Sequence, residues 1–198
     1  MSRNQLFPIF LKIDKIRTLL VGGGAVGLEK LEALLKNNPE AWVKLVATDI
    51  SDEIKEIAKS KENIELVERP FKPQDLEGDI QLLILATDIR ETNKEIYQLA
   101  KQKGILTNVA DTPDLCDFYL GSTVTKGDLK VGISTNGKSP TFAKRFREVL
   151  EEILPEETDS LIQNLHGIRN KLNVGFAEKV KILNERTKEL VSSRGSEK

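Results

Sequence analysis

The stretch TLLVGGGAVGLEK, residues Thr18–Lys30, decides the fold of this chain of 198 residues. Its first part, Thr18–Val21, is a short apolar run of the kind that forms a buried strand. From Leu28 onward, leucines recur at helical spacing. The stretch therefore predicts a strand, a glycine-rich turn and a helix in immediate succession.

The glycines of this turn satisfy the pattern G-x-G-x-x-G, in the strand-to-helix setting that makes the pattern informative. Gly22 permits the tight turn, Gly24 lets a pyrophosphate approach the backbone, and Gly27 lets the helix pack close to the strand. The start of the helix, with Ala25 and Val26, offers free N–H groups to the phosphates. We interpret the turn as a dinucleotide site; the alternative is that the glycines serve the turn alone.

Apolar runs and amphipathic stretches alternate along the following part of the chain. Strands are predicted at 42–47, 64–67, 81–86 and 105–109, and helices from Ser51 and over Glu91–Lys103. Alternating units of this length form a parallel sheet with helices on both faces. The predicted fold class is therefore α/β, with a Rossmann-type parallel sheet.

The pattern changes after Pro113. Phe118–Thr125 and Leu129–Ser134 predict a hairpin, a helix is predicted from Ser139 to Ile153, and the residues beyond Pro155 are polar and helical. We expect three parts: a Rossmann domain at 1–112, a small α+β region at 113–152, and a helical C-terminal domain at 153–198.

The composition excludes several classes of protein. Thirty Lys and Arg against 31 Asp and Glu leave a net charge of −1, so the chain has no global field for gripping nucleic acid. Its longest apolar runs are too short to span a membrane. The N-terminus lacks the pattern of a signal peptide, and we expect a cytoplasmic protein.

The chain has a single cysteine and a single histidine, which limits the kinds of disulfide, metal site and catalytic site that it can form. Cys116 excludes an internal disulfide and any multi-cysteine metal site, and without a partner histidine it is interpreted as a structural thiol. His166 excludes His-pair metal motifs, and its apolar neighbours favour a packing or interface role. No metal ligands are assigned.

Two further segments follow predicted strands and are assigned to the cofactor. Asp49, 22 residues after Gly27, is placed with Ile50 at the adenosine ribose, and the lack of a nearby arginine favours NAD over NADP. Thr87 and Asp88 follow the fourth strand, at the edge where ligands of such sheets bind. The alternative for that segment is an ordinary helix cap.

Asp111 closes the fifth strand at the same edge. A carboxylate there, near a nicotinamide, could accept or donate a proton. The alternative is a turn residue before Pro113.

Positive charge concentrates around the helix that begins near Ser139, at Lys138, Lys144, Arg145 and Arg147. Such a patch suits a substrate with several carboxylates. The alternative is a solvated helix face balanced by glutamates, namely Glu148, Glu151 and Glu152.

Assembled, these segments resemble the siroheme-synthase dehydrogenase family, which comprises precorrin-2 dehydrogenases and the N-terminal part of trifunctional siroheme synthase. The resemblance runs collinearly through residues 6–155. Its matching pieces are LFPIF at Leu6–Phe10, VGGGAVGLEK at Val21–Lys30, Ala86-Thr87-Asp88 with Asn93, NVADTPDLCDFYLGS at Asn108–Ser122, and STNGKSPTFAKRFREVLEEILP at Ser134–Pro155.

The resemblance implies NAD-dependent oxidation of precorrin-2, a tetrapyrrole, to sirohydrochlorin. It also implies a homodimer in which the region after Asp111 serves dimerisation and substrate binding. The essential aspartate of the family maps onto Asp111, and a family serine maps onto Thr135, which keeps the hydroxyl. Relatives carry alanine where this chain has Gly27, a change expected to be harmless.

Two alternatives remain. A bifunctional enzyme would also insert Fe²⁺ into sirohydrochlorin, and the shortage of histidine does not exclude this. A non-catalytic NAD-sensing regulatory module would explain the glycine turn, but not the segments at Asn108–Asp111 and Asn136–Pro140.

Overall fold

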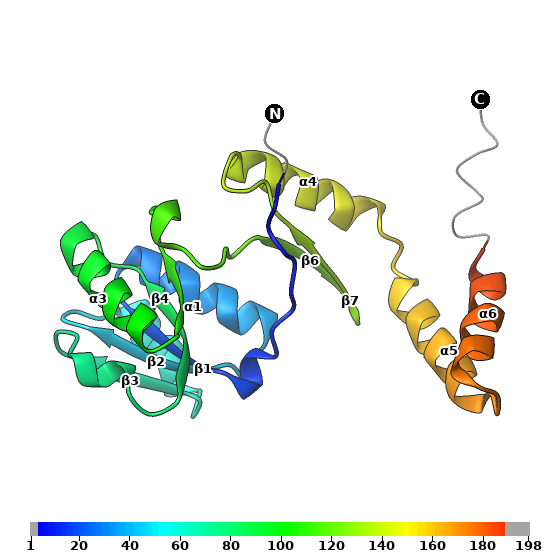
Figure 1. The fold of residues 1–198 in the computed structure, drawn as a ribbon, viewed down its shortest axis with the longest axis horizontal. Helices are drawn as coiled ribbons and strands as arrows, with labels where there is room; N and C mark the ends of the chain where they lie inside the picture. Colours follow the sequence, from blue (N-terminus) through cyan, green and yellow to red (C-terminus); the bar gives the residue numbers. More distant parts are fainter. Residues whose placement is uncertain (1–3, 189–198) are drawn as a thin grey trace. The chain divides into compact units, whose positions relative to one another are not determined.

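The computed structural model describes residues 4–188, which form two compact units, one of residues 5–120 and one that begins at Gly121 (Figure 1). The first unit contains a parallel sheet in the order β3-β2-β1-β4-β5. The strands are β1 (Arg17–Val21), β2 (Trp42–Ala47), β3 (Ile64–Glu68), β4 (Ile80–Leu85) and β5 (Leu106–Val109). The predicted α/β fold with a Rossmann-type sheet is confirmed.

Three helices flank this sheet: α1 (Ala25–Asn37), α2 (Asp52–Lys59) and α3 (Arg90–Gln102). Side chains alternate across a strand, so neighbouring residues of β1 serve different halves of the core. Leu20 packs with Leu31 of α1 and Ile54 of α2, whereas Leu19 packs with Ile96 of α3. The glycine turn at the end of β1 is thus held by a core on both faces.

Three short 3₁₀ helices were not expected from the sequence, namely η1 (Ile13–Lys15), η2 (Pro73–Leu76) and η3 (Pro113–Leu115). The second of these carries Asp75, which is 2% exposed. Arg69 donates to both carboxylate oxygens of Asp75 at 2.7 Å, and Lys44 of β2 lies 3.1 Å away. The Arg69 guanidinium, helped by the Lys72 N–H and by Lys44, holds the pKa of Asp75 well below its usual range.

The second unit begins with an antiparallel hairpin of β6 (Ser122–Lys126) and β7 (Leu129–Ile133), joined through Gly127 and Asp128. Three helices follow: α4 (Pro140–Ile153), α5 (Thr158–Lys171) and α6 (Phe176–Thr187). Asp159 of α5 accepts the backbone N–H of Asp128 at 2.8 Å, and a β-carbon on Gly127 would collide with the Asp159 side chain. The hairpin turn is therefore fitted to α5.

One predicted boundary is wrong: the first hairpin strand starts at Ser122, not at Phe118. The residues before it lie along the outer edge of β5 instead. The Asp117 N–H donates to the Thr107 carbonyl at 2.7 Å, and the Asn108 side chain donates to the Phe118 carbonyl at 2.8 Å. These contacts cover an otherwise open strand edge.

Residues 113–120 belong to the first compact unit, while the division into three domains stays a prediction. The C-terminal helices are present as predicted up to Thr187, and residues 189–198 of the predicted helical domain lie outside the described part. Within residues 4–188, no helix is long and apolar enough to cross a membrane.

Candidate cofactor site

Four loops of the first unit meet at the carboxyl edge of the parallel sheet. Backbone hydrogen bonds join them in pairs: Gly22 N–H to Val46 O at 3.0 Å, Ala86 N–H to Val21 O at 2.8 Å, and Ala110 N–H to Leu85 O at 2.9 Å. The loops after β1, β2, β4 and β5 therefore lie next to one another. In open α/β sheets this edge is where ligands bind.

Two glycines shape the turn after β1. Gly22 has φ +124°, and a β-carbon there would collide with the Ala86 carbonyl oxygen. A β-carbon on Gly27 would collide with the Gly22 carbonyl oxygen. The close packing predicted for Gly27 is present, and this backbone leaves no room for a larger residue there.

Gly24, Ala25 and Val26 are exposed at the start of α1. No atom lies within 4 Å of a β-carbon built on Gly24, and no side chain caps the first turn of α1. The first N–H groups of a helix have no partner within the helix. Open N–H groups beside a turn free of side chains fit the pyrophosphate of a nicotinamide dinucleotide.

The loop after β2 packs directly on this glycine turn. The Ser51 N–H donates to the Gly23 carbonyl at 3.0 Å, and a β-carbon on Gly23 would lie 2.9 Å from the Ile50 Cα. The Ile50 side chain is 2% exposed and belongs to the core, so its backbone alone can line the site. Asp49 is exposed, and within residues 4–188 its carboxylate has no hydrogen bond or ion pair. It is therefore free to accept hydrogen bonds from a ribose.

The loop after β4 is held in place by a residue that was not among those predicted from the sequence to bind the cofactor. Asn93 of α3, 4% exposed, donates to the Thr87 carbonyl at 2.8 Å and accepts from the Thr87 hydroxyl at 2.7 Å. Asp88 next to it is exposed. The sequence offers one sign of this role, because Asn93 is a polar residue on the side of its helix that faces an apolar strand.

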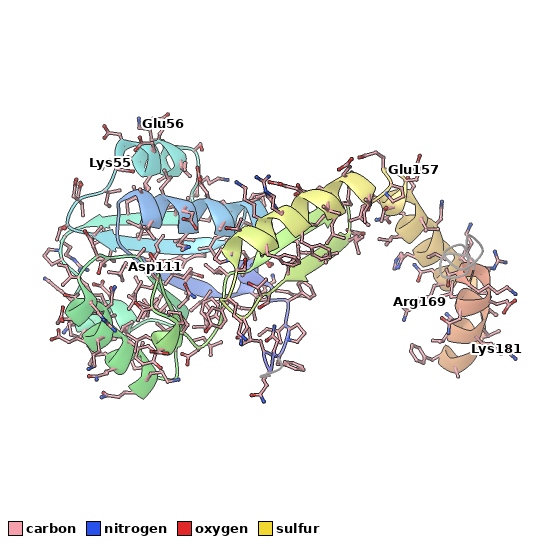
Figure 2. The ribbon with its side chains drawn as sticks, turned by 90° about the horizontal axis from the view of Figure 1, so that it is seen from above. Lys55, Glu56, Asp111, Glu157, Arg169 and Lys181 are labelled. Carbon is pink, nitrogen blue, oxygen red and sulfur yellow. The ribbon has the colours of Figure 1, made fainter. Side chains whose placement is uncertain are left out.

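Asp111 follows β5 and adopts φ +55°, a left-handed conformation that aspartate tolerates better than most residues (Figure 2). Its side chain is exposed, and among the described residues no group is hydrogen-bonded or ion-paired to its carboxylate. The structure thus presents an unengaged carboxylate at the same edge as the glycine turn.

Cys116 shapes the loop that carries Asp111. Its Sγ accepts from the Val109 N–H at 3.3 Å and donates to the Val109 carbonyl at 3.2 Å. Burial raises the pKa of this thiol, which keeps it protonated and unreactive. The structural interpretation of the cysteine agrees with these contacts.

The residues predicted to bind substrate lie in the second unit. Thr135 Oγ1 accepts the Ser139 N–H at 3.2 Å, and Ser139 Oγ accepts the Phe142 N–H at 3.2 Å, which caps α4. Lys138 and Lys144 are exposed beside this helix start. Ion pairs engage the other two basic residues, Arg145 with Glu148 at 2.8 Å and Arg147 with Glu151 at 3.8 Å.

Neither a metal centre nor a buried histidine emerges from the described residues. Among residues 4–188, no group of three or more His, Cys, Asp and Glu side chains is arranged to hold a metal ion. His166 is exposed on α5, 3.0 Å from the Asn170 amide, so it does not pack into the core of this chain, and the interface role stays a prediction.

Comparison with known proteins gives matches along most of the chain. Residues 9–122 match the family described as "Putative NAD(P)-binding", and residues 126–153 match "Sirohaem biosynthesis protein central". The siroheme synthase of Pseudoalteromonas translucida (strain TAC 125) is 36% identical over 87% of this chain and 36% of its own length. Siroheme synthase 3 of Aeromonas hydrophila is 36% identical over 86% of this chain and 36% of its own length.

The chain thus spans little more than a third of the length of these relatives. A solved structure described as SirC, precorrin-2 dehydrogenase, matches with a TM-score of 0.71 at 25% identity, covering 91% of this chain and 88% of that one. An NAD(P)-binding family matches more than half of the chain, and the sirohaem segment follows it in order. The chain therefore belongs to the family described as "Putative NAD(P)-binding", and the segment described as "Sirohaem biosynthesis protein central" follows that domain in the chain.

Proposed function

We propose that this chain is an NAD-dependent dehydrogenase that oxidises precorrin-2 to sirohydrochlorin. The observation that carries the proposal is the unengaged Asp111 carboxylate at the sheet edge that also holds the open glycine turn. The similarity to SirC, precorrin-2 dehydrogenase, and to siroheme synthases supports the same activity.

The reaction removes two hydrogens from the macrocycle, one as a hydride and one as a proton. A bound NAD⁺ supplies the hydride acceptor. Gly24, Ala25 and Val26 would hold its pyrophosphate through backbone N–H groups, and Asp49 would bind its ribose. The Asp111 carboxylate would accept the proton, because it carries no competing hydrogen bond within the described part of the chain.

The macrocycle carries several carboxylates, which basic side chains of the second unit would bind. Lys138 and Lys144 are exposed at the start of α4. Arg145 and Arg147 would exchange their glutamate partners for substrate carboxylates, and Thr135 would orient the ring. Each such exchange is inexpensive, because exposed ion pairs contribute about 0–1 kcal/mol.

We infer NAD rather than NADP as the cofactor from the loop after β2. Asp49 is the first charged side chain there, and a carboxylate binds the 2′-hydroxyl of NAD but repels the 2′-phosphate of NADP.

We infer a homodimer from the exposed face of α4. Phe142, Phe146, Val149 and Ile153 repeat at helical spacing and are 43–59% exposed. The two phenylalanine rings stack with centroids 5.9 Å apart. A continuous apolar stripe of this kind suits an isologous contact with a second copy.

The direct test is to mix protein, NAD⁺ and precorrin-2 and to follow absorbance at about 340 nm, where the reduced nicotinamide absorbs. Absorbance that grows in proportion to enzyme supports the dehydrogenase. Tight NAD⁺ binding with no growth would identify a sensor and contradict the proposal. A parallel assay with sirohydrochlorin and Fe²⁺ measures whether the chain also inserts the metal.

A further inference from the structure

Glu68, the last residue of β3, connects the loop after β2 to a lysine of α2. Its Oε1 accepts the Ile50 backbone N–H at 3.2 Å and binds the Lys55 ammonium at 2.9 Å. Ile50 follows Asp49 in the loop that packs on Gly23, and Lys55 stands on α2 (Figure 2). A single oxygen of the Glu68 carboxylate therefore positions the loop that carries Asp49 and also binds the Lys55 side chain beside that loop.

The charges around this loop are unbalanced. Asp49, Asp52 and Glu68 bring three carboxylates, and Lys55 feels all three, because its pKa is raised first by the hydrogen bond to Glu68 and then by Asp52 and Asp49. Arg69, the next residue after Glu68, is occupied by Asp75 through two bonds of 2.7 Å. Both Lys55 and Arg69 are therefore already paired with carboxylates of the chain.

We propose that Glu68 is a positioning residue that makes the cofactor site selective for NAD over NADP. It does so by binding Lys55, which would otherwise pair with the 2′-phosphate of NADP, and by holding Asp49 in place through the Ile50 N–H. This inference rests on the proposed function, since it assumes that the adenosine ribose lies at Asp49.

The test is to measure the dissociation constants of NAD⁺ and NADP⁺ by calorimetry for the full chain and for Glu68→Gln. The glutamine oxygen can still accept the Ile50 N–H, but it no longer carries the charge that holds Lys55. The preference for NAD⁺ should fall about fivefold, mostly through tighter NADP⁺ binding. The difference should shrink as salt is raised, because the charges involved are partly exposed.

Two control variants separate this effect from a change of net charge or of fold. Glu65→Gln changes the same charge at the other end of β3 and should leave the preference unchanged. Adding Lys55→Gln to Glu68→Gln should restore the preference for NAD⁺. Lys55→Gln alone should strengthen the preference, because Glu68 is then left without its counter-ion, and this variant serves if Glu68→Gln does not fold.

The outcomes are distinguishable. An unchanged ratio of the two constants in Glu68→Gln, with NAD⁺ still bound, overturns the role of Glu68 and leaves the dehydrogenase proposal standing. A wild-type protein that binds NADP⁺ as tightly as NAD⁺ also overturns it. A wild-type protein that binds neither dinucleotide contradicts the proposed function itself, and the role of Glu68 with it.

Discussion

Asn93 holds both the backbone and the hydroxyl of Thr87: its amide nitrogen donates to the Thr87 carbonyl at 2.8 Å, and its amide oxygen accepts from the Thr87 hydroxyl at 2.7 Å. The Asn93 side chain is almost wholly buried, and these two bonds satisfy its oxygen and one of its donors. The loop after β4 is thereby fixed beside the glycine turn, where the proposed cofactor binds.

Asn93→Ala should destabilise the protein and weaken NAD⁺ binding together. Removing the amide leaves the Thr87 carbonyl without its partner, which costs about 1–3 kcal/mol of unfolding free energy. Urea denaturation measures the loss, and calorimetry measures the affinity. Asn170→Ala removes an exposed amide from α5 and should change neither. An Asn93→Ala protein as stable as the wild type would show that the two hydrogen bonds between Asn93 and Thr87 contribute nothing to stability.

Gly24→Val should abolish tight cofactor binding while leaving the fold intact. Gly24 has φ −87°, which valine adopts without strain, and a β-carbon there meets no protein atom within 4 Å. The valine methyl groups would instead fill the space that the pyrophosphate must enter, and we expect affinity for NAD⁺ to fall at least about tenfold, equivalent to 1.4 kcal/mol.

Gly132→Val, another glycine with open space around it, is the matched control and should bind NAD⁺ normally. Gly27→Ala, unlike Gly24→Val, should lower the unfolding free energy, because its β-carbon collides with Gly22 O. Unchanged NAD⁺ affinity in Gly24→Val would remove the dinucleotide from this turn.

The parallel sheet was predictable because its signals are local. The apolar run Thr18–Val21 and the leucines after Leu28 report burial at fixed periods, and G-x-G-x-x-G sits between them. The side chains of the site were less predictable where their roles depend on distant partners. Glu68 is an ordinary polar residue in the sequence, and only the fold brings it to Ile50. Asn93 is noted beside Ala86-Thr87-Asp88 in the sequence, but only the fold shows that its side chain binds Thr87.

The predicted start of the first hairpin strand was wrong for the same reason. Phe118–Gly121 has the apolar character of a strand, but Asp117 and Phe118 are bound to the edge of β5, a contact between segments that no periodicity encodes. The buried pair of Asp75 and Arg69 could not be predicted either, since an aspartate two residues after a proline indicates only a turn.

Asp75→Asn should lower the unfolding free energy by a few kcal/mol, since it leaves Arg69 and Lys44 without their shared counter-ion. The pH dependence has a fixed sign. Asp75 has its pKa depressed in the folded state, so its contribution is complete above the unfolded pKa of about 3.9 and is lost as pH falls below that value. The wild type should lose stability between about pH 4 and pH 2 more steeply than Asp75→Asn.

Chemical denaturation between about pH 4 and pH 2 measures how steeply the unfolding free energy of the wild type and of Asp75→Asn falls with pH. Asp114→Asn removes an exposed carboxylate whose side chain has no hydrogen bond or ion pair within residues 4–188, and it should leave the wild-type slope in place. Parallel curves for the wild type and Asp75→Asn would mean that the ion pair contributes nothing to acid stability.

Phe146→Glu should separate the proposed dimer into monomers. Phe146 lies in the middle of the exposed stripe of α4 and stacks on Phe142, so a charge there would be buried without a partner at the contact. Light scattering should give twice the chain mass of 22.2 kDa for the wild type and the single mass for the variant. Glu152→Lys, an exposed change on the same helix, should stay dimeric. A wild-type protein with the single mass at micromolar concentration would contradict the homodimer.

Asp111→Asn should keep the fold and the affinity for NAD⁺ but lose turnover. Asparagine tolerates the left-handed backbone at this position as well as aspartate does, so the loop should be preserved. An amide cannot take up the macrocycle proton, and loss of a general base lowers kcat about 10²–10⁴-fold. Asp114→Asn, three residues further in the same loop, should retain normal kcat. Lys144→Glu should instead raise KM with little change in kcat, because it weakens attraction to the substrate carboxylates, and Thr135→Ala should have a milder effect than Asp111→Asn. Near-normal turnover of Asp111→Asn at saturating NAD⁺ and precorrin-2 would reduce Asp111 to a turn residue, and the proton would then need another acceptor at this edge.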